Sequence, residues 1–235
     1  MEGSLLSILS LGFILGIKHA LEPDHVIAVS TIASQSKKLS RSSLAGVFWG
    51  IGHTLTLFVV GMTVIFMKGE IPEKWAMSLE FLVGIMLVYL GISSILRLRK
   101  MRATRHTHIE MTHDHFHLHP IKPNPAHVHK NISYWKSLII GIVHGLAGSA
   151  AMVVLTMSTV HSVWEGAIYM LVFGLGTVAG MLLSTTLIGI PFVLSANKHS
   201  INSWLTQATG TISTLFGIYY MYNLGITEGL FSMWF

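Results

Sequence analysis

Long apolar stretches alternate with short polar ones along most of this chain. Three of them, 137–160, 166–197 and 199–227, contain no Asp, Glu, Lys or Arg. A run of about 18 apolar residues is enough to cross a bilayer. The segments lack the alternation of barrel strands, and backbone in hydrocarbon must satisfy its own hydrogen bonds, so we expect helices. Six spans are predicted, at about 5–33, 44–67, 75–96, 137–160, 166–194 and 201–224.

The composition agrees with a membrane protein. Of the 235 residues, 51% are hydrophobic and 11% are charged, against a charged share of about 25% in soluble domains. The absence of cysteine excludes disulfides and thiolate metal sites. The first residues lack the basic region of a signal peptide, so we expect the first apolar run to stay in the mature protein. The fold class is therefore predicted as an all-α integral membrane protein.

The basic residues predict the orientation in the membrane. Three loops that share one side carry 12 basic residues, namely Lys37, Lys38, Arg41, Arg97, Arg99, Lys100, Arg102, Arg105, Lys122, Lys130, Lys136 and Lys198. The opposite side has only Lys68 and Lys74. The positive-inside rule puts the first side in the cytoplasm and both termini outside. The sequence pI of about 9.5 then reflects topology, not nucleic-acid binding.

The two halves of the chain resemble each other. Three pairs of short segments recur in the same order, at 16–21 and 141–146, at 49–53 and 173–177, and at 84–89 and 217–222. Because three spans is an odd number, the halves would be inverted, a common plan for secondary transporters. The alternative is coincidental packing of small residues. The predicted organisation is a first three-helix repeat over 1–96, a cytoplasmic loop over 97–136 and a second repeat over 137–235.

The first span contains an unusual polar motif. His19, Glu22, Asp24 and His25 lie within seven residues of an otherwise apolar segment. Charge is costly in a bilayer, so such residues are functional candidates, and imidazole with carboxylate suits a divalent metal such as nickel, cobalt or zinc. On an ideal helix the two histidines would point about 120° apart, but Pro23 should kink or unwind the span and bring them onto one centre. The alternative is a hydrogen-bonded polar cluster at a helix end.

Two further spans each carry a histidine. His53 follows a glycine in the middle of the second span, and we expect it to act as a ligand or gate, although a lone histidine is often only a satisfied polar residue. His144 stands at the repeat position of His19 but has no carboxylate neighbours. It and Glu22 are predicted as pathway residues, with Ser149 and Thr156 as weak polar partners of His144.

The loop between the third and fourth spans is rich in histidine. Eight of the 14 histidines lie there, at His106, His108, His113, His115, His117, His119, His127 and His129. Its prolines argue against regular structure, and tracts of this kind are typical of flexible metal-binding segments. We expect loose binding, as a metal buffer or sensor. The alternative is a solvated linker.

The His-x4-Asp-His pattern in a membrane span resembles the signature of the nickel/cobalt transporter family, and the chain is most similar to its UreH-like branch of urease accessory membrane proteins. The resemblance extends to the Gly-His-Thr of the second span, the histidine-rich loop and the glycine-rich fourth and fifth spans. It implies that His19, Asp24 and His25 are required for transport and that His53 takes part. Typical members have eight spans against six here, and the residues between histidine and aspartate differ, which leaves the preference between nickel and cobalt open.

Together with this resemblance, these observations predict a secondary transporter of Ni²⁺, with Co²⁺ as the alternative ion, in a bacterial-type cytoplasmic membrane, moving the ion inward for urease maturation. Efflux is the alternative direction. No nucleotide-binding motif is present, and we expect no organic cofactor and no nucleic-acid partner. The expected partners are the bilayer, the metal ion, and urease accessory proteins or a metallochaperone.

Two other classes of protein remain open at this stage. A membrane metalloenzyme with a histidine box would use the same residue types, but the His-Glu-x-x-His signature is absent, so we expect no enzyme. A metal-sensing scaffold would bind metal in the loop without transporting it.

Overall fold

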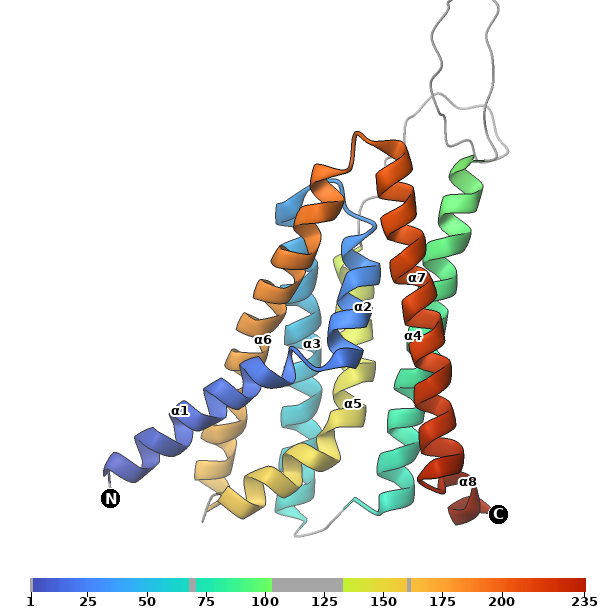
Figure 1. Ribbon diagram of the computed structural model, residues 1–235. Coiled ribbons are helices and arrows are strands. Elements are labelled where there is room, and N and C mark those ends of the chain that lie inside the picture. The colour runs from blue at the N-terminus through green and yellow to red at the C-terminus, as the bar shows by residue number, and fades with distance from the viewer. Residues whose placement is uncertain (1, 68–70, 103–132, 160–161) are drawn as a thin grey trace, which may run out of the picture.

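The computed structural model describes residues 2–67, 71–102, 133–159 and 162–235, and this part of the chain is helical, without strands. Its elements, in chain order, are α1 (Glu2–His19), α2 (Pro23–Ala33), α3 (Leu39–Phe66), α4 (Glu73–Arg102), α5 (Tyr134–Thr159), α6 (Val163–Leu194), α7 (His199–Tyr222), the π-helix η1 (Asn223–Thr227) and α8 (Leu230–Trp234). Figure 1 shows that the long helices run side by side along one axis. The all-helical prediction is confirmed for these residues.

The lengths and compositions of the helices suit a membrane. Helices α3, α4 and α6 are each long and apolar enough to cross a bilayer, and α1 with α2 counts as a fourth span if this bent pair is taken together. The first predicted span is thus two helices. The third continues past the expected end of the first repeat, because α4 runs on to Arg102.

The helices form two groups, which meet where α4 packs against α5 and are also bridged by α2. Helix α3 packs along α5 and α6, α1 packs against α6, and α4 packs against α7. Helix α2 contacts α4, α6 and α7 and lies between the two groups (Figure 1). The largest cluster of buried apolar residues surrounds it and includes Val29, Trp49, Leu87 and Met181. This arrangement places the side chain of His25, near the start of α2, inside the protein.

Glycines set how closely the helices approach. A Cβ added at Gly16 would collide with the carbonyl oxygen of Phe173 on α6, and one at Gly141 would collide with the carbonyl oxygen of Trp49 on α3. Backbone contact of this kind requires a residue without a side chain. The four-helix group that carries the polar motif is therefore held by direct backbone packing.

Candidate metal centre

The break between α1 and α2 determines where the motif lies. Helix α1 ends at His19, α2 begins at Pro23, and the two axes meet at 56°. Proline favours the first position of a helix and pushes the residue before it into an extended conformation. Glu22 has such a conformation, with φ −63° and ψ 150°. The turn is closed by the Glu22 N–H, which donates to the His19 carbonyl oxygen at 3.1 Å.

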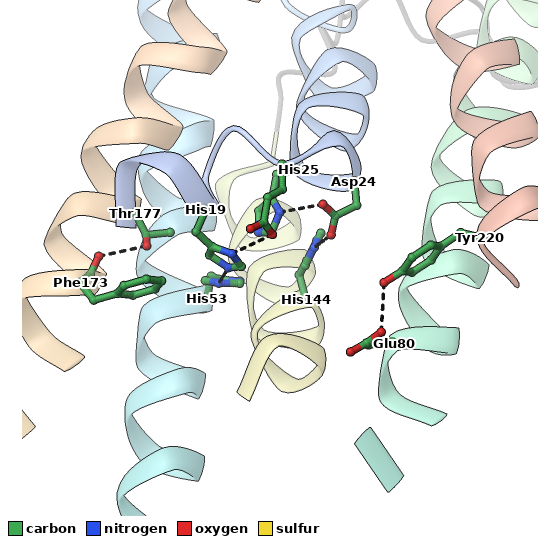
Figure 2. A network of polar contacts seen from close by, with 10 residues as sticks. His19, Asp24, His25, His53, Glu80, His144, Phe173, Thr177 and Tyr220 are labelled. Carbon is green, nitrogen blue, oxygen red and sulfur yellow. Dashed lines mark hydrogen bonds and ion pairs between the residues drawn. The ribbon is translucent and has the colours of Figure 1, made fainter. Parts of the chain in front are cut away.

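Four histidines from four helices meet at this break (Figure 2). The ring centroid of His25 lies 4.6 Å from that of His19, 5.1 Å from that of His53 and 4.0 Å from that of His144. The residues come from α2, α1, α3 and α5 respectively. His25, His53 and His144 are at most 2% exposed. The structure therefore gathers all four membrane histidines named from the sequence into one buried cluster.

Two carboxylates orient three of these rings. Asp24 accepts from His25 Nδ1 at 3.1 Å through one oxygen and from His144 Nε2 at 2.7 Å through the other. Glu22 lies on the outer side of His19, with its Oε2 2.9 Å from His19 Nδ1. A carboxylate on one ring nitrogen fixes the tautomer and leaves the second nitrogen free to bind a metal.

Several nitrogens of the cluster are buried without a hydrogen-bond partner among the described residues. They are Nε2 of His25, Nδ1 of His53 and Nδ1 of His144, together with the indole Nε1 of the neighbouring Trp49. His19 and His53 face each other through their Nε2 atoms at 3.0 Å. Buried polar atoms without partners are rare in proteins. Lone pairs on neutral imidazole are good ligands for first-row divalent metals, so the arrangement can bind such an ion.

The possible ligand atoms fall into two groups of three. His19, His25 and His53 offer one atom each within 4.8 Å of one another, and so do Asp24, His25 and His144. The sequence predicted a single centre for His19, Asp24 and His25. The structure separates Asp24 from His19, because Asp24 turns toward α5 while His19 turns toward α3 (Figure 2).

Apolar side chains surround the cluster. The ring of His25 stacks with that of Trp49 at a centroid distance of 6.1 Å, and the ring of Phe173 lies 5.5 Å from that of His19. An apolar shell of this kind excludes water and strengthens electrostatic interactions at a metal site.

Other residues named from the sequence lie away from the cluster or outside the described part. Ser149 and Thr156 donate to the carbonyl oxygens of Leu146 and Met152 within α5, so neither is a partner of His144. The partner of His144 is Asp24. The eight histidines of the 97–136 loop lie outside the described residues.

Sequence reasoning missed a second carboxylate within the apolar helices. Glu80 lies on α4, and its Oε2 accepts from the hydroxyl of Tyr220 on α7 at 3.3 Å (Figure 2). Charge is costly in a bilayer, and this argument identified the motif in the first predicted span. Applied to the third predicted span, the same argument would have identified Glu80.

Comparison with known proteins gives several matches. The sequence model of the family described as cytochrome c biogenesis protein transmembrane region matches residues 26–221. The urease accessory protein UreH of Bacillus sp. (strain TB-90) is 66% identical over 230 residues, which cover 98% of this chain and 97% of that protein.

More distant relatives also match. A protein of Methanocaldococcus jannaschii that is provisionally named a nickel/cobalt efflux system is 26% identical over 220 residues, 88% of each chain. The chloroplast protein FOR GROWTH AND FERTILITY 1 of Arabidopsis thaliana is 26% identical over 183 residues, 76% of this chain and 48% of that protein. No solved structure matches at a comparable level of significance.

Proposed function

We propose, from the premise that this chain belongs to the family described as cytochrome c biogenesis protein transmembrane region and to the family of the urease accessory protein UreH, that it carries Ni²⁺ across a membrane as a secondary transporter. The ion is the transported substrate. Co²⁺ is the closest alternative substrate, because the same imidazole and carboxylate ligands suit both metals.

The buried histidine cluster is the observation that supports this proposal most directly. An ion that leaves water must regain its ligands inside the protein, and His19, His25 and His53 offer nitrogen atoms from three helices. Asp24 supplies negative charge in a low-dielectric surrounding, where it offsets more of the ion's double positive charge than it would in water. A site of this kind between apolar helices is typical of an ion pathway.

The relatives support nickel and suggest two directions of transport. UreH is named a urease accessory protein, which supports a role in urease maturation and uptake into the cell. The Methanocaldococcus relative carries the name of an efflux system, which makes export the second candidate. Neither relative is named as an enzyme, and the proposed role requires no chemical step.

An inverted repeat is the scaffold that we propose for this function. Under the offsets of the sequence repeat, the contact of Gly16 with Phe173 corresponds to that of Gly141 with Trp49. The approach of Gly176 to the carbonyl oxygen of Phe13 likewise corresponds to that of Gly52 to the carbonyl oxygen of Leu138. Six spans, with 1–96 and 137–235 as the halves, account for these paired contacts.

Uptake of radioactive nickel into proteoliposomes tests the proposed function. Liposomes with the full-length protein should accumulate Ni²⁺ down its gradient, and His25→Ala should abolish accumulation, since both groups of ligands include His25. His199→Ala, on the exposed first turn of α7, is the matched control and should transport as the wild type does. No accumulation by correctly folded wild-type protein would refute the proposal.

A further inference from the structure

We propose that the transported ion occupies two alternative positions that share the imidazole of His25, and that it moves from one to the other as it passes through the protein. This inference rests on the proposed function and adds a second metal position, formed by Asp24, His25 and His144. The first position is formed by His19, His25 and His53. Each group of three offers its ligand atoms within 4.8 Å of one another.

The two nitrogens of His25 serve the two positions. Its Nδ1 lies 3.1 Å from Asp24 Oδ1, in the second position. Its Nε2, at the other edge of the ring, is buried without a partner among the described residues and is the atom left for the first position. His25 therefore lies between the two positions and is a ligand in both.

One ring cannot serve both positions at once while it remains neutral. A neutral imidazole carries a proton on one nitrogen and a lone pair on the other. With the ion in the first position, Nε2 binds the metal and Nδ1 keeps its proton, which it donates to Asp24. With the ion in the second position, Nδ1 binds the metal and the ring proton stands on Nε2, so the two positions require different tautomers of His25. The charge of the ring is unchanged, and the two positions exclude each other.

The shift would bring the ion into contact with the second half of the chain. The first position uses α1, α2 and α3, whereas the second brings in His144 from α5. His144 Nε2 already lies 2.7 Å from Asp24 Oδ2, so a small opening of this hydrogen bond admits an ion between them. The second position adds a carboxylate oxygen as a direct ligand, which compensates the ion's charge better than three neutral rings do.

Metal stoichiometry and ligand identity test the two-position proposal. The full-length protein in detergent, with the eight histidines of the 97–136 loop replaced by alanine so that only the buried cluster is titrated, should bind one Ni²⁺ per chain in calorimetric titration with nickel chloride, and the variants below are made in this background. His144→Ala should bind one ion through three imidazoles, and His53→Ala should bind one through two imidazoles and a carboxylate, as counted by X-ray absorption at the nickel edge. The double variant should bind none. His144→Ala should retain nickel transport, but at a rate lower than that of the wild type by about tenfold or more. Changes around a metal site typically lower metal affinity or activity about 10–100-fold.

Each contrary outcome has a definite meaning. Two ions per chain once the loop histidines are replaced, wild-type transport by His144→Ala, or complete loss of binding in His53→Ala alone would each overturn the two-position proposal and leave nickel transport standing. Wild-type protein that neither binds nor transports nickel would instead refute the proposed function. His144→Gln, which can still hydrogen-bond to Asp24 but is a poor nickel ligand, should behave as His144→Ala does and guards against misfolding. Gel filtration establishes that each variant is folded.

Discussion

Asp24 accepts hydrogen bonds from two imidazoles at once, one through each oxygen of its carboxylate. An asparagine at this position would keep the shape but would lose the negative charge and one of the two acceptors. We therefore expect Asp24→Asn to lower nickel uptake to about a tenth of wild type or less, because groups that orient metal ligands typically contribute 10–100-fold. The measurement is radioactive-nickel uptake with protein amounts matched by blot. Uptake at the wild-type rate would show that Asp24 is only structural.

Glu80 is a half-buried carboxylate on α4 that accepts from the hydroxyl of Tyr220. A negative charge among apolar helices acts over a longer range than it would in water, so Glu80 should attract a cation toward the cluster without being a ligand. We expect Glu80→Gln to raise the nickel concentration needed for half-maximal uptake several-fold, with little change in the maximal rate. Glu73→Gln, in the exposed first turn of the same helix, is the matched control. Equal concentration dependence in both variants would assign Glu80 a structural role.

The residues of the site could be predicted from the sequence, but their grouping could not. The motif from His19 to His25 is local, and a charged motif in an apolar span signals function without any tertiary information. The contact between Asp24 and His144 joins residues 120 positions apart. This contact depends on how α2 and α5 are rotated about their own axes. The hydrophobic periodicity of the sequence does not determine that rotation. His144 was consequently expected to have polar partners on its own helix.

At the scale of the helices, Pro23 separates α1 from α2. Without proline, Glu22 would no longer be restricted to an extended conformation, and residue 23 would regain an N–H that could continue the helix. We expect Pro23→Ala to reduce nickel uptake several-fold, less than His25→Ala does, because the break is also held by packing around α2. The measurement is proteoliposome uptake beside circular dichroism. Unchanged uptake would mean that packing alone maintains the bend.

Two glycines on α5 offer a test of backbone packing. A Cβ at Gly141 would collide with backbone of Trp49, whereas one at Gly148 would meet its nearest atom, on Leu57, at an ordinary 3.6 Å. We expect Gly141→Ala to destabilise the protein by about 1–3 kcal/mol, the usual cost of overpacking, and Gly148→Ala to be close to neutral. Thermal unfolding in detergent measures the difference. Equal melting temperatures would show that α3 and α5 can separate without cost.

The helices were easier to predict than their ends. Apolar length indicates a helix wherever it exceeds the thickness of a bilayer, and α3, α4 and α6 follow this rule. Apolar length alone does not show where one type of helix changes to another within an uncharged stretch. The uncharged stretch over 199–227 contains both α7 and the π-helix η1, where Gly225 lies against the ring of Phe231. Phe231 lies beyond this stretch, in α8, so the apolar pattern of 199–227 does not indicate where α7 gives way to η1.

At the scale of the whole molecule, we predict that both termini are extracytoplasmic and that the 97–136 loop is cytoplasmic. The basic residues support this orientation. Aromatic residues gather at the same end as the C-terminus, where Trp75 and Trp234 pack edge to face at 5.0 Å and Lys74 lies over the Trp234 ring. Trp and Lys are typical of a membrane interface. Reporter fusions after Phe235 and within the loop test the topology, and a cytoplasmic C-terminus would contradict the six-span count.

The matched glycine contacts of the two halves have a consequence for energetics. Two pairs of glycine contacts match between the halves, yet His19, Asp24, His25 and His53 belong to the first half and only His144 to the second. In an inverted repeat with identical halves, the conformations open to either side would be related by symmetry and would hold an ion equally well. In this chain the two conformations should hold the ion unequally, because the metal ligands are divided unequally between the halves. The concentration gradient of the ion still sets the net direction of transport. The ion concentration at which transport saturates should, however, differ between the two sides of the membrane.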